Sequence, residues 1–81
     1  MNNVVTIRQE TIRPVYSNGK IFAAFTYEIF DTINNIVDKH EKHLLLQDAE
    51  TLALPDLIQL CLSVTEEYRV NIQESINNGS N

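Results

Sequence analysis

The N-terminal part of the chain alternates between apolar and polar residues as a β-strand does, but the alternation changes phase. Val5 and Ile7 fall on one face of a period-two pattern, whereas the next apolar residues fall on the other face: Ile12, Pro14 and Tyr16. A shift of one residue turns every side chain to the opposite face, so the pattern predicts a bulge or break near residues 8–10. Pro14 has no N–H to donate, which favours an edge position for this segment.

A tight hairpin turn is predicted where Asn18 and Gly19 follow this segment. Both residue types tolerate the positive φ that the two central positions of a type I′ turn require. The turn fixes the pairing of its two strands, in which Tyr16 lies opposite Ile21, Pro14 opposite Ala23, and Ile12 opposite Phe25. We therefore interpret residues 20–27 as the second strand, with four residues facing inward: Ile21, Ala23, Phe25 and Tyr27.

A second interpretation of the same region rests on helical periodicity. Apolar residues and one histidine recur at spacings of 4, 4, 4, 3, 4 and 4: Ile21, Phe25, Ile29, Ile33, Ile36, His40 and Leu44. If this stripe begins at Ile21, residues 20–46 form one helix and the fold is mainly α with a short N-terminal strand. The turn chemistry favours the strand over residues 20–27. Both interpretations predict a helix over residues 29–45.

The C-terminal part of the chain is predicted to be a second helix, from about Asp56 to Ile76. Pro55 suits the first turn of a helix, where its missing N–H is not needed. In residues 57–64, six of eight positions are apolar, and a helix that is apolar nearly all round must be covered on more than one side. This predicts a homodimer in which the helix lies at the interface, through Leu54, Ile58, Cys61, Leu62, Thr65, Tyr68 and Ile72.

Together these elements predict an α+β fold, in which an N-terminal β-hairpin or ribbon is followed by two α-helices. The chain of 81 residues suffices for one small domain, which we place at residues 1–76, with a flexible polar tail at 77–81.

The charge of the chain is acidic, with six Lys and Arg against eleven Asp and Glu and a net charge of −5. The six cations are scattered, so we do not expect nucleic-acid binding, which depends on basic side chains that neutralise phosphates. Residues 29–81 alone carry nine anions and three cations. We therefore expect a protein partner with a basic surface, steered by five acidic candidates: Asp38, Glu41, Glu66, Glu67 and Glu74.

No residue is predicted to be catalytic, to bind a cofactor or to bind a metal ion. His40 and His43 would share one face of the helix predicted here, but a closed tetrahedral metal site needs four ligands and no other histidine exists. Cys61 lies in the most apolar segment, where burial makes a thiol inert. The chain also lacks the glycine-rich phosphate loops and the nucleophile and metalloprotease motifs of common enzymes.

The start of the chain lacks a signal peptide, and the longest apolar run, residues 21–25, is too short to span a membrane, so we expect a cytoplasmic protein. These exclusions favour a small, non-catalytic interaction protein that modulates or inhibits a macromolecular partner, as an inhibitor or adaptor. Nine Asn and nine Ile fit an AT-rich source such as a phage or mobile element. Two alternatives are a structural subunit of a larger assembly and a β-ribbon nucleic-acid regulator that gathers Arg8, Arg13 and Lys20 from two chains.

Overall fold

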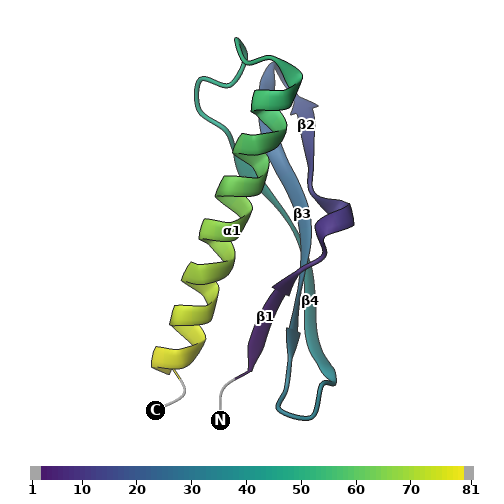
Figure 1. Cartoon of the computed structure of the whole chain (residues 1–81), viewed down its shortest axis with the longest axis vertical. Coiled ribbons are helices and arrows are strands. Elements are labelled where there is room, and N and C mark those ends of the chain that lie inside the picture. Colours follow the sequence, from purple (N-terminus) through teal and green to yellow (C-terminus); the bar gives the residue numbers. More distant parts are fainter. Residues whose placement is uncertain (1–2, 80–81) are drawn as a thin grey trace.

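The computed structural model describes residues 3–79 as an antiparallel sheet with one helix packed on it (Figure 1). The elements in chain order are β1 (Val4–Ile7), the short 3-10 helix η1 (Gln9–Thr11), β2 (Arg13–Ser17), β3 (Lys20–Phe30), β4 (Ile36–Leu45) and α1 (Leu54–Gly79). The α+β class is confirmed. Within the described residues, however, the fold contains four strands and one α-helix, not a hairpin and two helices.

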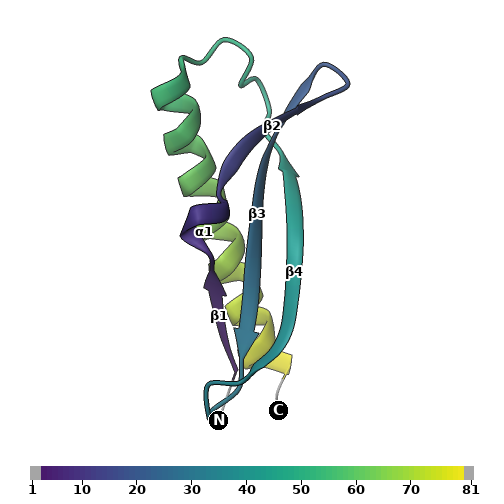
Figure 2. The same ribbon diagram turned by 90° about the vertical axis from the view of Figure 1, so that its right-hand side faces the viewer.

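β3 is the central strand of the sheet, and all three other strands pair with it in antiparallel orientation. β1 and β2 lie along the same edge of β3, β1 against its C-terminal half and β2 against its N-terminal half, while β4 occupies the other edge (Figure 2). β1 and β2 therefore act as one edge strand that is interrupted by η1. This interruption is the predicted break near residues 8–10.

The predicted hairpin turn joins β2 to β3. Asn18 has a φ of 53° and Gly19 a φ of 74°, the positive values that a type I′ turn requires. The predicted pairing is confirmed for Tyr16 with Ile21 and for Pro14 with Ala23. The ladder ends at Arg13, so the expected pairing of Ile12 with Phe25 is absent from it. Residues 20–27 are a strand, as predicted, and that strand continues to Phe30.

The prediction of a helix over residues 29–45 is wrong, and with it the mainly α alternative. Asp31 reverses the chain, because its Oδ1 accepts hydrogen bonds from the N–H groups of Ile33 (3.0 Å) and Asn35 (2.9 Å). Asn34 takes a left-handed φ of 66°, which asparagine tolerates better than most residues. The chain leaves this turn as β4, which runs back along β3 instead of continuing as a helix.

The core lies between α1 and one face of the sheet. α1 packs mainly on β1, β2 and β3, and all four residues predicted to face inward from β3 are buried. One apolar cluster gathers around the start of α1 and contains Ile21, Ala23, Leu46, Ala49, Leu57 and Cys61. A second cluster contains Val5, Ile7, Phe25 and Tyr27, against which Tyr68, Ile72 and Ile76 of the helix pack.

α1 confirms the helix predicted over residues 56–76 and extends it in both directions. It includes residues 77–79 of the expected tail, whereas residues 80 and 81 lie outside the described part of the chain. Near its C-terminal end, Gln73 accepts a hydrogen bond from the Val5 N–H at Oε1 (2.9 Å) and donates one from Nε2 to the Asn3 carbonyl (2.8 Å). The helix thus satisfies one backbone group of β1 and one of the residue before it, which a neighbouring strand would otherwise satisfy.

Phe25 is fully buried at the centre of the second cluster, where its ring meets that of Tyr68 edge-on at 5.5 Å. We expect Phe25→Ala to lower the free energy of unfolding by about 3–5 kcal/mol, because it removes buried apolar surface and leaves a cavity. Ile33→Ala is the control, since Ile33 is 73% exposed in the β3–β4 turn and its loss should change the value by less than about 0.5 kcal/mol. Equal urea midpoints for the two variants would contradict this placement of the core.

Candidate interaction surface

In the part of the chain that the structure describes, no helix lies on one face of the sheet, and we call this face the uncovered face. Because side chains alternate along a strand, the residues of β3 between the inward-facing ones point to this side: Phe22, Ala24, Thr26, Glu28 and Phe30. α1 lies against the opposite side (Figure 1). The residues of β1, β2 and β4 that pair with these five positions lie on the same face and complete the surface available to a partner.

Two rows of apolar side chains cross the uncovered face, one near each end of the sheet, and we call them the apolar rows. The first runs across three strands through Val15, Phe22 and Leu45, and the second through Val4, Phe30 and Ile36. Phe22 and Phe30 are eight residues apart on one strand, which places the rows about 26 Å from each other at about 3.3 Å per residue. Val4, Ile36 and Leu45 are exposed, and the other three are half-buried.

A hollow adjoins the second apolar row. It has a volume of about 400 Å³ and is lined by Val4, Thr6, Phe30, Asp31 and Asn34. The Asp31 turn that redirects the chain into β4 therefore also forms one wall of this hollow. The lining combines apolar side chains with polar ones, so the hollow offers both kinds of contact to a side chain.

Between the apolar rows lies a band of paired charges. Arg13 of β2 reaches across β3 to Glu41 of β4, with Nη2 at 2.8 Å from Oε2. Ala24, which pairs with Arg13 on β3, is fully buried even though it faces this side, because the long arginine side chain crosses it. Arg13 and, to a smaller extent, His43 hold the pKa of Glu41 below its usual value by hydrogen bonds to its carboxylate.

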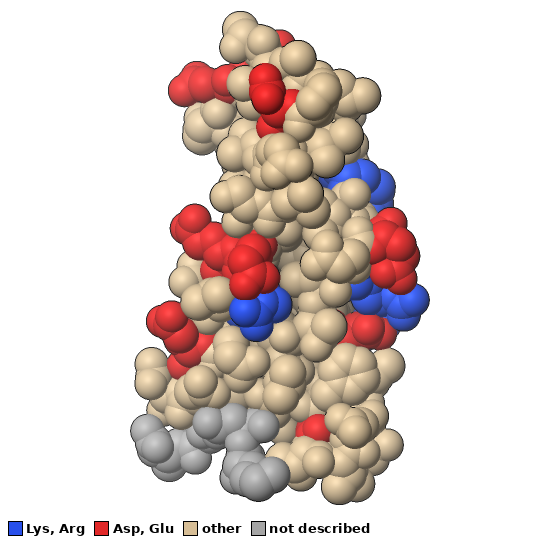
Figure 3. All heavy atoms as spheres, in the orientation of Figure 1, with Lys and Arg blue, Asp and Glu red and all other residues tan. Residues whose placement is uncertain are grey.

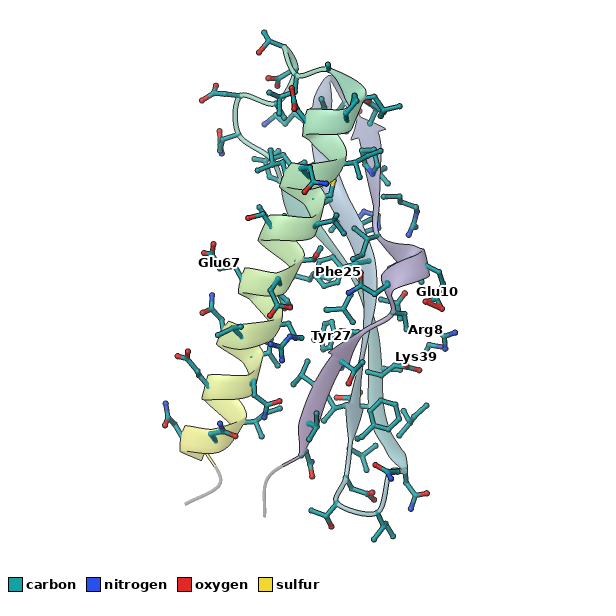
Figure 4. All side chains as sticks on the ribbon, viewed as in Figure 1. Arg8, Glu10, Phe25, Tyr27, Lys39 and Glu67 are labelled. Carbon is teal, nitrogen blue, oxygen red and sulfur yellow. The ribbon has the colours of Figure 1, made fainter. Side chains whose placement is uncertain are left out.

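A second pair in the same band involves the buried carboxylate of Glu28. Glu28 is 5% exposed, and Nη1 of Arg8 lies 3.6 Å from its Oε2. Arg8 also binds Glu10 at 3.0 Å, so one guanidinium joins η1 to β3. Figure 4 shows Arg8, Glu10 and Lys39 together on the side of the sheet away from α1. Since a buried carboxylate needs compensation, Arg8 stabilises the middle of this face.

Most of the seven helix residues predicted to form the dimer interface pack instead on the chain's own sheet, so a dimer interface through them is not supported. Cys61 and Thr65 are each 1% exposed, and Tyr68 and Ile72 pack on the second core cluster. Leu62 is half-buried, and only Leu54 and Ile58 at the start of the helix are exposed. The physical reason is that the sheet accommodates a wide apolar arc: Leu57, Leu60, Cys61 and Val64 all contact the first core cluster.

The five acidic candidates do not form one surface. Asp38 lies 2.8 Å from His40, Glu41 pairs with Arg13, and Glu66 binds Arg69 at 2.7 Å on α1. Glu67 borders a hollow between α1 and β4 together with Leu44 and Leu45. Glu74 lies seven residues further along the helix. Figure 3 shows acidic side chains in separate groups on this side of the molecule.

The two histidines lie on opposite faces of β4, so the shared face that a helix would have provided does not exist. His40 pairs with Tyr27 on the side of α1, where the two rings are 5.2 Å apart. His43 pairs with Ala24 on the uncovered face. Residues three apart on a strand alternate between faces, whereas on a helix they are neighbours. Cys61 lies in the core, where burial raises the pKa of its thiol.

The sequence reasoning missed the apolar rows and the charge pairs between them. A signal for half of this surface was present in β3 itself, where Phe22 and Phe30 occupy positions between the inward-facing residues. Recognising it required the strand to continue to Phe30 instead of ending at Tyr27. The other half comes from β4, whose residues were assigned to a helix.

The charge band makes a prediction about the acidity of Glu41. Arg13→Gln removes the larger cause of its lowered pKa, so we expect the pKa of Glu41 to rise toward its usual value in a carbon-detected NMR titration. The matched control, Arg69→Gln, should raise the pKa of Glu66 and leave that of Glu41 unchanged. An unchanged Glu41 in the Arg13 variant would show that the pair does not form in solution.

The lowered pKa of Glu41 also determines how the stabilisation by the Arg13–Glu41 pair depends on pH. Because the pKa of Glu41 is lower in the folded chain than in the unfolded one, the stabilising contribution is fully present above the unfolded pKa. It is lost as the pH falls through the lowered, folded value. We therefore expect the stability difference between the wild type and Arg13→Gln to shrink in acid, as measured by urea unfolding at a series of pH values.

Two absences hold for the described residues as a whole. No helix among residues 3–79 combines the length and apolar character that crossing a bilayer requires. The same residues contain no group of three or more His, Cys, Asp and Glu side chains placed to hold one metal ion. Comparison with protein-family models, with curated proteins and with solved structures gave no match to this chain.

Proposed function

We propose that this chain is a non-catalytic interaction module that modulates a macromolecular partner by binding it on the uncovered face of the sheet. The observation that carries the proposal is the pattern on that face, where two apolar rows flank a band of paired charges. When a partner covers apolar side chains that are in contact with water, the free energy of the system falls. A partner that meets both rows therefore gains most from this face.

The spacing of the rows favours a protein as that partner. A ligand that contacts both rows must reach about 26 Å along β3, which is longer than a small molecule and well within the width of a protein surface. Two apolar contacts separated by a polar strip also specify orientation, because a partner shifted along the face would place apolar groups on charges.

The charges of the band suit a protein partner and not a phosphate backbone. Arg8 and Arg13, two of the three cations in the nucleic-acid alternative, are bound to Glu10, Glu28 and Glu41. Their positive charge is largely compensated within the chain, and the net charge of −5 repels a polyanion. The same net charge attracts a partner with a basic surface and speeds the encounter at low ionic strength.

The chemistry of the described residues supports a binding role without catalysis. The Cys61 thiol is buried and has a raised pKa, which disfavours the reactive thiolate. His40 and His43 point to opposite sides of β4, so they do not converge on one substrate atom. The carboxylates of the uncovered face are engaged by arginines at 2.8 Å and 3.6 Å.

The test is a comparison of variants in quantitative capture of partners from the source cell. Val4→Asp and Val15→Asp each place a charge in one apolar row, on the β1–β2 edge. We expect each to weaken binding of the principal partner at least about tenfold, or about 1.4 kcal/mol. The matched control is Ile58→Asp, which places the same charge at an exposed apolar position on α1.

All three variants are first checked for native circular dichroism. If a partner binds the wild type and both valine variants equally well, the uncovered face is not the binding surface. If Ile58→Asp alone abolishes binding, the surface lies at the start of α1 instead.

A further inference from the structure

The outer edge of β4 is the feature of this fold that most needs a partner. Among the strands of residues 3–79, β4 pairs only with β3. Nine of its ten residues are exposed, and Leu44 is half-buried. α1 packs mainly on the other three strands, so it leaves this edge open (Figure 2). A long unpaired edge presents a row of N–H and C=O groups to which another strand can add.

The opposite edge of the sheet is not available in the same way. It is interrupted by η1 and contains Pro14, which has no N–H. At β1, Gln73 of α1 already accepts the hydrogen bond of the outward-facing Val5 N–H. Of the described strands, β4 therefore presents the longest available edge, which is regular from Asp38 to Leu45 and irregular only at Val37, where the register with β3 shifts by one residue.

The backbone groups that β4 turns outward can be assigned from its pairing with β3. Leu46 N–H donates to the Ile21 carbonyl at 2.9 Å, so the even-numbered residues along the regular part of β4 turn their backbone groups toward β3. Lys39, Glu41 and His43 turn theirs toward solvent. Consistent with this assignment, the Lys39 N–H is bound by its neighbour's side chain, Oδ1 of Asp38, at 3.0 Å.

The side chains on this edge form a charge pattern that is complementary to itself. Residues 38–42 read Asp, Lys, His, Glu, Lys, so that opposite charges lie at equal distances on either side of His40. In an antiparallel pair of identical strands centred on His40, Lys39 lies opposite Glu41 of the second copy and Asp38 lies opposite Lys42. Each pairing occurs twice because of the two-fold axis.

We propose that β4 pairs with β4 of a second copy of this chain, antiparallel and centred on His40. Lys39 and Glu41 then exchange backbone hydrogen bonds with Glu41 and Lys39 of the other copy, and the two His40 residues form the non-hydrogen-bonded pair at the axis. The sheet becomes continuous across the dimer, with both helices on the same side of it.

The faces of the sheet agree with this pairing. A two-fold axis perpendicular to the sheet keeps each face on its own side, so every residue must meet one from the same face. Asp38 and Lys42 both lie on the side of α1, since Asp38 binds His40 beside Tyr27 and Lys42 lies over the Tyr68 ring. Lys39 and Glu41 pair with Glu28 and Thr26 on the uncovered face.

Neighbouring registers are less favourable. Moving the axis to Glu41 places the two Glu41 carboxylates directly opposite each other, and moving it to Lys39 does the same for two ammonium groups. Like charges that face each other across strands are destabilising, whereas opposite charges stabilise the pair. The charges thus allow this edge to pair with itself in one register and disfavour strands that lack the pattern.

The contacts within one chain leave room for the pairing. Arg13 and His43 both contact Oε2 of Glu41, and a carboxylate has a second oxygen that can accept from Lys39 of the other copy. When the Lys39 N–H joins the ladder, it releases Oδ1 of Asp38, which is then free to meet Lys42. Asp38 therefore occupies in the monomer the N–H that the dimer uses.

The test uses two charge reversals that are each incompatible with the pairing but compatible with each other. Lys39→Glu places two carboxylates opposite each other at both contacts, and Glu41→Lys places two ammonium groups there. We expect the wild type to sediment at twice the 9.3 kDa of one chain and each variant to dissociate at least about tenfold more readily. Mixed in equal amounts, the two variants should form a heterodimer, because both contacts then join opposite charges.

Matched reversals away from the edge, Lys20→Glu and Glu67→Lys, change the net charge equally and should leave the dimer intact. A monomeric wild type, a dimer that survives both edge reversals, or two folded variants that fail to associate when mixed would each overturn the proposal. The oligomeric state is measured on the isolated chain without the partner, so these outcomes are distinguishable from those of the partner-binding test.

An independent measurement locates the axis. The two His40 Cα atoms should lie about 4.5 Å apart, as in any non-hydrogen-bonded antiparallel pair, which is within the range that a disulfide spans. We therefore expect His40→Cys to form a covalent dimer on mild oxidation, with Cys61 unreacted in the core. Lys20→Cys, at the β2–β3 turn, should form no covalent dimer under the same conditions, and equal cross-linking of both would contradict the register.

Discussion

The fold depends on the pairing of β3 with strands on both of its edges. β3 contributes four buried side chains to the core: Ile21, Ala23, Phe25 and Tyr27. Each of the other described strands is held in place by its hydrogen bonds to β3. Burial of these four side chains against α1 removes apolar surface from water, which is the main favourable contribution to folding. The same strand carries Phe22 and Phe30 on its other side, so its alternation also determines what remains for a partner.

A single helix can cover only one face of a sheet, and this limit explains why one face and one edge of the sheet remain in contact with solvent. α1 lies over β1, β2 and β3, satisfies the outward-facing backbone of β1 through Gln73, and leaves both the uncovered face and the β4 edge in solvent. Both regions in solvent carry charged side chains. Arginines pair with glutamates on the uncovered face, and acidic and basic residues alternate along the β4 edge. The two proposed interactions use different features of these regions: a partner meets the apolar rows, whereas a second copy pairs with the outward-facing backbone of β4.

The parts of the fold that were predicted from the sequence are those specified by local physical chemistry. Asn18 and Gly19 determine a turn by their own backbone preferences, and Pro55 with the following periodicity determines a helix. β4 was missed because both of its faces are exposed, so its residues carry no alternation from which a strand could be inferred. The signal for the reversal before it lies in the side chain of Asp31, which binds two backbone N–H groups. The apolar rows could not be assembled without that strand, since each takes one of its three residues from β4.

The hydrogen bonds of Gln73 have a consequence for the order in which the chain folds. The β2–β3 and β3–β4 hairpins join residues close in sequence, so each can form with a small loss of loop entropy. β1, in contrast, has only four residues. Its Val5 N–H donates a hydrogen bond to Gln73 of α1, which lies 68 residues further along the chain. Such a contact is favourable only once the segments between have been ordered. We therefore expect the two ends of the described chain to complete the fold together, after both hairpins have formed.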